Sequence, residues 1–251
     1  MSTWSGLWFK EWKMMQVTYL VTLSLCVAAV LFGPAFLGFD EIYLVSGIVI
    51  ALLVFMFPAL LMTSLNKETD QLAQFLHTPV SGMKLIGVKF LQSGLVVGLL
   101  GVCFSLITIL TVQPYAGLDF DQLLLYGMYF LLLALGQGLT LAIIVFFLWV
   151  VNGILRVYIG GVSIAISIGI FILMMYLEER IAATELFQRI TTWGELSIPA
   201  SDMSFIFSGA AVEIGMEDGF VFMLGVPLFW SVILIAMFAL GLFLLDRKVE
   251  V

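Results

Sequence analysis

Charge is what this sequence has least of. Only 11% of its 251 residues are charged, whereas a soluble domain typically carries about 25%. There is one histidine, and both cysteines lie inside apolar runs, so no disulfide framework or set of metal ligands can be assembled. Together with a mean hydropathy of +1.18, the scarcity of charge excludes an ordinary soluble domain. The informative features are therefore apolar runs long enough to cross a membrane.

Motifs for chemistry are also missing. The sequence has no GxxxxGK[ST] phosphate-binding loop, so we expect no ATP hydrolysis by this chain. A membrane-embedded serine protease would need a histidine at depth, but His77 lies in a polar insert. The cores of the apolar runs contain no Asp or Glu, which argues against an aspartyl-type membrane protease and an ion-coupled carrier. We predict no enzyme, no bound cofactor and no metal.

Six apolar runs are long enough to span a bilayer, which takes about 20 residues. They predict an all-α polytopic membrane protein, with residues 1–251 forming a single transmembrane domain. The first could instead belong to a cleaved signal peptide, but it is too long and lacks a clear small-residue cleavage site. The runs are 14–39, 42–66, 90–118, 122–155, 157–177 and 219–245.

The distribution of basic residues predicts the orientation. With six spans both termini share a side, and that side holds eight of the ten Lys and Arg residues with five acidic ones. The opposite side holds two basic residues and twelve carboxylates. Because Lys and Arg accumulate on the cytoplasmic side, we expect a multi-pass cell-membrane protein with cytoplasmic termini. The acidic balance belongs to the outer face and gives no sign of nucleic-acid binding.

The N-terminal segment 1–16 has a tryptophan face and a basic face. At helical spacing three tryptophans share one side and two lysines the other, although Glu11 and Phe9 break the pattern. Such a helix suits the headgroup region of a bilayer, and the alternative is a frayed extension of the first span. The residues of this predicted interfacial elbow are Trp4, Trp8, Trp12, Lys10 and Lys13.

Three other features concern the spans and the outer side. Gly94, Gly98 and Gly101 form a small-residue ridge, which serves packing within one chain or a dimer contact. The segment 178–218 is a long extracytoplasmic connection, expected to hold a short helix ended by Pro199 and to lie on the surface or dip into the membrane. Amides within the spans line a substrate path or make interhelical hydrogen bonds: Gln92, Gln137 and Asn152.

The polar insert 66–80 separates the second and third apolar runs on the predicted cytoplasmic side. Thr69 or Asp70 could cap a short helix, whose apolar face would comprise Leu72, Phe75 and Leu76. Pro79 would end it, and Ser81 would start a helix leading into the third span. A simple connector needs no apolar face toward the cytosol, although a helix resting on the lipid surface would also carry one.

This insert resembles the first cytoplasmic loop of type 2 ABC-transporter permeases. The shared features are the acidic residue, the short helix, the stretch His77–Ser81 ("HTPVS") and a lysine-bearing start to the third span. The N-terminal "LWFKEW", the six spans and the long outer connection between the fifth and sixth spans also match that family. The resemblance implies that Thr69, Asp70, Leu72, Phe75, Leu76, His77 and Pro79 form a coupling helix on an ATPase subunit.

The resemblance further implies the membrane-spanning permease subunit of an ATP-driven exporter. Two copies of a separate ABC ATPase would bind ATP and Mg²⁺, and a second permease chain, identical or homologous, would complete the path in the lipid bilayer. The competing hypothesis is a non-transporting scaffold, sensor or immunity factor whose inner loop binds a cytosolic partner.

Overall fold

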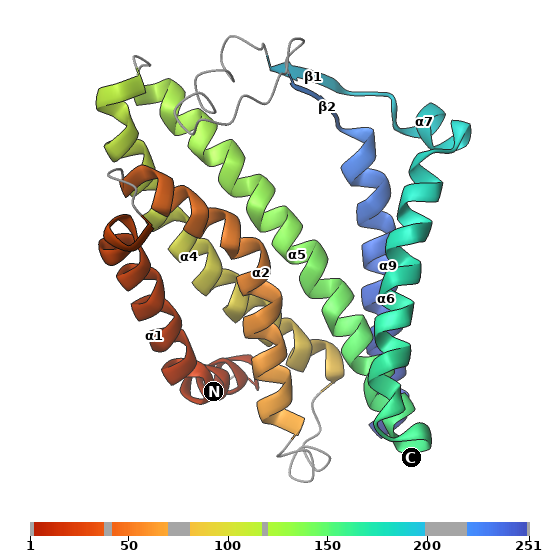
Figure 1. Cartoon of the computed structure of the whole chain (residues 1–251). Helices are drawn as coiled ribbons and strands as arrows, with labels where there is room; N and C mark the ends of the chain where they lie inside the picture. Colours follow the sequence, from red (N-terminus) through yellow and green to blue (C-terminus); the bar gives the residue numbers. More distant parts are fainter. Residues whose placement is uncertain (1–2, 38–41, 70–80, 117–119, 199–219, 250–251) are drawn as a thin grey trace. The chain divides into compact units, whose positions relative to one another are not determined.

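The computed structural model describes residues 3–37, 42–69, 81–116, 120–198 and 220–249 (Figure 1). Within these ranges six helices are long and apolar enough to cross a membrane, which confirms the predicted number of spans. They are α1 (Thr3–Leu37), α2 (Ile42–Thr69), α4 (Gly82–Ala116), α5 (Phe120–Ile159), α6 (Val162–Ala182) and α9 (Gly225–Val249). The chain divides into two units, one of residues 1–150 and 240–251, the other of residues 151–239.

In the first unit α1, α2 and α4 pack against one another, and α5 runs alongside them. Aromatic side chains join three of these helices: Phe90 of α4 lies edge-on to Phe57 of α2 and to Phe146 of α5, with ring centroids 6.1 and 5.9 Å apart. Many large apolar side chains remain exposed, such as Leu31 and Leu99. Exposed leucines on all-apolar helices are expected where lipid replaces water around the protein.

Helix α1 is continuous from Thr3 to Leu37, and Figure 1 shows its first turns at an angle to the rest. At 1.5 Å per residue, its 35 residues span about 50 Å, more than the bilayer's hydrocarbon core. Part of the helix must therefore lie outside that core. This geometry accommodates the predicted N-terminal elbow, but the seating of that elbow in the headgroup region stays a prediction.

Span boundaries differ from the sequence prediction around the fifth run. Helix α5 continues past Arg156 to Ile159, and the chain then turns at Gly160, whose φ of 60° favours glycine. Helix α6 begins at Val162, five residues later than the predicted span. The apolar run gave no indication of this break except its paired glycines, Gly160 and Gly161.

The second unit contains two short strands, which corrects the all-helical expectation for the outer connection. After α7 (Glu185–Thr191), β1 (Glu195–Ile198) pairs antiparallel with β2 (Phe220–Met223), so no helix runs up to Pro199. Gly194, three residues beyond the end of α7, has a φ of 72°, which favours glycine at this turn into β1. The strand residues are rich in β-branched and aromatic types, which favour strands. Ser201 and Asp202, either of which the sequence offers as the cap of another helix after Pro199, lie outside the described residues.

Packing in the second unit depends on one close approach. Gly225, the first residue of α9, lies so near the backbone of Thr191 that any Cβ atom there would overlap it. Just beyond, Phe187 of α7 packs edge-on against Phe229 of α9, with ring centroids 5.1 Å apart. The glycine thus lets the end of α7 and the start of α9 meet.

Candidate functional site

Three helices of the first unit contribute a buried charged cluster. Glu11 belongs to α1, Ser64 to α2 and Lys89 to α4. Glu11 is followed at four-residue intervals by Met15 and Tyr19, and all three are buried, so one stripe of α1 faces its neighbours. Lys89 is only 1% exposed, which is exceptional for a lysine.

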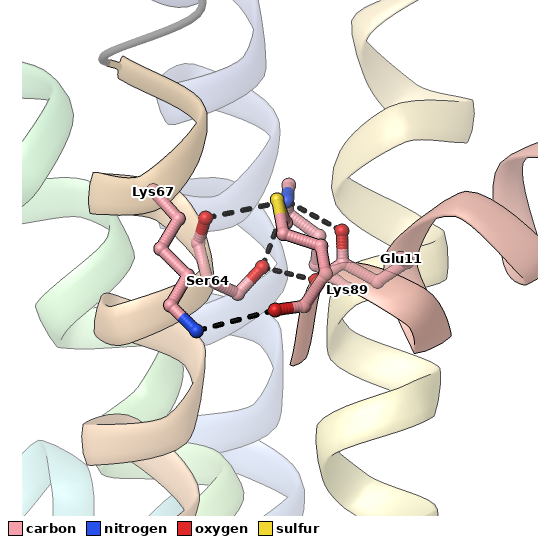
Figure 2. Close-up of polar contacts among 5 residues, drawn as sticks. Glu11, Ser64, Lys67 and Lys89 are labelled. Atoms are coloured by element: carbon pink, nitrogen blue, oxygen red, sulfur yellow. Dashed lines mark hydrogen bonds and ion pairs between the residues drawn. The ribbon is translucent and has the colours of Figure 1, made fainter. Parts of the chain in front are cut away.

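The ammonium group of Lys89 is fully engaged. Its Nζ donates to Glu11 Oε2 at 2.8 Å, to Ser64 Oγ at 2.7 Å and to the Ser64 backbone oxygen at 3.5 Å. The hydroxyl of Ser64 in turn donates to Glu11 Oε1. Figure 2 shows the three side chains converging from their separate helices. Each of the three donors of the lysine therefore has an acceptor.

The charges of Glu11 and Lys89 cancel within the cluster. Burying an ion pair costs several kcal/mol of desolvation for each ion, and attraction offsets this only when the geometry is good and the remaining hydrogen bonds are made. Ser64 meets that requirement because it bonds to both charged groups. If the helices moved apart, each charge would be buried without its partner, which is strongly destabilising. The cluster therefore holds α1, α2 and α4 in one relative position.

A second contact joins α1 to α2 nearby. Lys67 Nζ donates to the backbone oxygen of Met14 at 3.2 Å (Figure 2). It also donates to Thr18 Oγ1 at 2.8 Å. Lys67 lies three residues after Ser64, on the last turn of α2. The end of α2 that leads into residues 70–80 is therefore anchored to α1 at two points.

Polar groups without a partner lie beside the cluster. The hydroxyl of Tyr19 and the Oγ of Ser93 are buried close to each other, but neither makes a hydrogen bond of normal geometry among the described residues. Gln92, three residues after Lys89, is also buried, and neither of its amide atoms has a partner. Unpaired polar groups are costly in a membrane. Their presence here shows that the buried polar region extends beyond the ion pair.

The cluster does not have the properties of a catalytic site. A serine hydroxyl 2.7 Å from a lysine amine could suggest a nucleophile with its base. Here, however, Lys89 Nζ donates to both Glu11 and Ser64, so its place in the cluster is that of a hydrogen-bond donor to the serine and not of its base. Ser64 is also completely buried, so no substrate can reach it. What this arrangement can do is hold three helices together.

The structure describes only part of the predicted coupling region. Thr69 is the last residue of α2, so it ends a helix instead of capping the start of one. Asp70, Leu72, Phe75, Leu76, His77 and Pro79 lie outside the described residues, and their docking role stays a prediction. The predicted helix start after Ser81 is confirmed, because α4 begins at Gly82 and two of its backbone N–H groups donate to the Ser81 oxygen.

The predicted elbow residues lie on the first turns of α1. Trp4 and Trp12 are 40% and 46% exposed, Trp8 is half-buried, and Lys10 and Lys13 are exposed. The ring of Trp4 lies 3.7 Å from the position that a Cβ of Gly87 would occupy, so it contacts α4 as well as the surroundings.

The three amides proposed for a substrate path differ in exposure and belong to two units. Gln92 is buried, whereas Gln137 is exposed on α5. Asn152 belongs to the second unit, is half-buried, and its Oδ1 has no partner among the described residues. The substrate role of each amide therefore stays a separate prediction.

Sequence reasoning missed Glu11 and Ser64 as site residues and counted Lys89 only as a cytoplasmic charge. The available signal was the position of Glu11 on the apolar side of the first helix, beside Trp8 and Met15. A carboxylate on an apolar face needs a buried partner. The identity of that partner, 78 residues away, required the fold.

Comparison of this chain with protein families, with curated proteins and with solved structures finds no match. Its function therefore has to be argued from its own residues and geometry.

Proposed function

We propose that this chain is the membrane-spanning permease subunit of an ATP-driven ABC exporter. In this proposal two copies of a separate ATPase subunit bind ATP and Mg²⁺, and a second permease chain, identical or homologous, completes the transport path. Support comes from the six membrane-length helices, from the resemblance carried by residues 66–90, and from the way the helices flanking the coupling loop are joined.

The position of the buried cluster is the observation that carries the proposal. Ser64 lies five residues before the end of α2, and Lys89 lies seven residues after the start of α4. At 1.5 Å per residue these side chains are about 8 and 10 Å along their helices from the residue 70–80 loop. Both flanks of the loop are thus bonded to each other and to Glu11 of α1.

A loop held in this way can transmit force. If the ATPase moves residues 70–80, the flanking helices cannot separate without breaking the ion pair, so they move with α1 as one body. Rigid-body movement of packed helices is a usual form of conformational change in proteins. The chain carries no ATPase motif of its own, which is why the energy for transport is assigned to a partner.

Copurification tests this proposal directly. The full chain is purified in mild detergent, and any bound ABC ATPase is identified by mass spectrometry. We expect Phe75→Asp and Leu76→Asp to release the ATPase, because each would bury an unpaired charge at the dock. Loss of an interface anchor costs about 2 kcal/mol or more, or roughly thirtyfold in affinity. Pro79→Ala should have a milder effect, since it leaves the apolar face intact.

The matched control is Gln74→Ala, which changes the same predicted helix outside its apolar face and should retain the ATPase. All variants must still reach the membrane. If both acidic variants retain the ATPase, or if the wild-type chain brings down a cytosolic partner without ATPase motifs, the exporter proposal fails. The second result would favour the scaffold, sensor or immunity-factor hypothesis.

A further inference from the structure

An apolar groove of 560 Å³ lies on the first unit, lined by residues of α2, α4 and α5. All ten of its lining residues are apolar, and Phe57 and Phe90 contribute aromatic rings. Gly98 adds no side chain, and a Cβ built there would meet nothing within 4 Å. The volume falls in the usual range for small-molecule sites. Along α4 the groove is open to the surroundings, since Leu91, Leu95 and Leu99 are at least half exposed.

A cation lies in line with this groove. Lys84 precedes Leu91 by seven residues, or two helical turns, so it shares a face of α4 with Leu91, Leu95, Gly98 and Val102. Lys84 is exposed, and its ammonium group makes no hydrogen bond or ion pair with a described residue. The ring of Trp4 lies over Gly87, one turn from Lys84. An indole beside a free ammonium is typical of the headgroup level of a membrane.

The dimensions match a lipid. From Leu91 to Val102 the groove follows α4 for about 17 Å, close to the depth of one bilayer leaflet, about 15 Å. Lys84 is about 10 Å further toward the helix end, within reach of a headgroup because lysine extends its ammonium on a long apolar stem. A substrate tail or a neighbouring helix could also fill an apolar groove, but a lysine in line with the groove favours an occupant with an anionic head.

We propose that this groove binds one acyl chain of an anionic phospholipid whose phosphate pairs with Lys84. The acyl chain gains packing contacts in the groove, since transfer between lipid and an apolar protein surface has no hydrophobic driving force. Selectivity for an anionic headgroup comes from the ammonium. The site requires only that the chain lies in a membrane, and it is independent of the proposed exporter function.

Native mass spectrometry of the full chain in mild detergent tests the site, with phosphatidylglycerol and phosphatidylcholine of the same acyl chains as probes. We expect the wild-type chain to retain phosphatidylglycerol preferentially. Lys84→Gln should weaken phosphatidylglycerol binding about fivefold and remove the preference, because one lysine near anionic lipid contributes about a fivefold effect. Gly98→Leu should reduce the binding of both lipids, because its side chain fills the groove.

Two matched variants separate the site from general effects. Arg189→Gln removes an exposed cation on α7 that belongs neither to the groove nor to the predicted elbow, and Gly169→Leu fills an equally open glycine position on α6. Both should bind lipid as the wild type does. The proposal is overturned if the wild type shows no headgroup preference, or if the control and site variants behave alike. It is also overturned if Gly98→Leu leaves lipid binding unchanged and instead dissociates a dimer, which would assign the groove to a second copy.

Discussion

The ammonium of Lys89 lies 2.8 Å from the carboxylate of Glu11, and both side chains are buried where α1, α2 and α4 meet. In a membrane helix a lone charge is expensive and a paired one marks a specific contact. The pair therefore fixes which face of α1 packs against α4. The contribution of the pair to the free energy of unfolding can be measured in variants that lack one or both side chains.

Breaking the pair from one side should be more harmful than removing it entirely. Lys89→Met leaves Glu11 buried without its cation, and Glu11→Met does the reverse, so each should lower the free energy of unfolding by about 3–5 kcal/mol. The double variant leaves only Ser64 short of partners, at about 1–3 kcal/mol. Unfolding in mixed detergent micelles would measure all three, with the exposed Lys13→Met as a neutral control. Additive losses in the double variant would show that the two charges do not stabilise each other.

The orientation prediction can be tested with single cysteines in a chain lacking Cys26 and Cys103. We expect cysteines at Asp40, Asp119 and Glu195 to react with an impermeant thiol reagent on intact cells. A cysteine at Gln74 should react only after the cells are opened. The buried pairing of Lys89 with Glu11 removes one basic and one acidic residue from the same side, so the charge asymmetry remains. Reaction at Gln74 but not at Glu195 in intact cells would reverse the orientation.

The tryptophans of the first helix test the elbow. In chains that keep only one of Trp4, Trp8 and Trp12, and in which the other three tryptophans of the sequence are replaced by phenylalanine, we expect lipids brominated near the headgroup to quench fluorescence more strongly than aqueous iodide does. Replacing all three with serine should weaken the seating of the first turns while the six spans still insert. Strong iodide quenching of Trp12 in the membrane-embedded protein would show that the segment lies in water.

Gly225→Ala should loosen the outer part of the second unit. Its methyl group would overlap the backbone of Thr191, and overpacking of this kind costs about 1–3 kcal/mol. Faster amide hydrogen exchange in β1 and β2 would report the effect. Gly169→Ala, in open space on α6, is the matched control and should leave exchange unchanged. Unchanged exchange in Gly225→Ala would mean that the close approach does not hold these strands.

Composition made the membrane helices predictable, because a bilayer core admits few charges and about 20 residues must cross it. The positions at which helices end inside apolar stretches were harder to predict from the sequence. The turn at Gly160 and the strand β2 both fall within runs that read as continuous, since lipid exposure makes every face of a membrane helix apolar. Only paired glycines and β-branched residues distinguished these places, and such local signals are weak.

The site was less predictable than the fold. The lysine at 89 was visible as a charge near the start of a span, yet its burial depends on a partner from a helix far away in the chain. The glutamate at 11 interrupted an otherwise regular tryptophan face, and that irregularity was the useful signal. Side-chain pairing across helices depends on their rotation and register, which a single sequence does not specify for helices that are apolar on all sides.

The separation of Glu11 and Lys89 in the chain has a consequence for biogenesis. At 5–20 residues per second, the ribosome needs on the order of 4–16 seconds to make the 78 residues between them. During that interval the first helix carries a carboxylate with no cation to meet it, so its N-terminal turns have to wait near the aqueous boundary. The first helix can complete its packing against α4 only after the start of the third membrane helix has been translated. A nascent chain stalled before that point would present an unpaired acidic residue to the insertion and quality-control machinery.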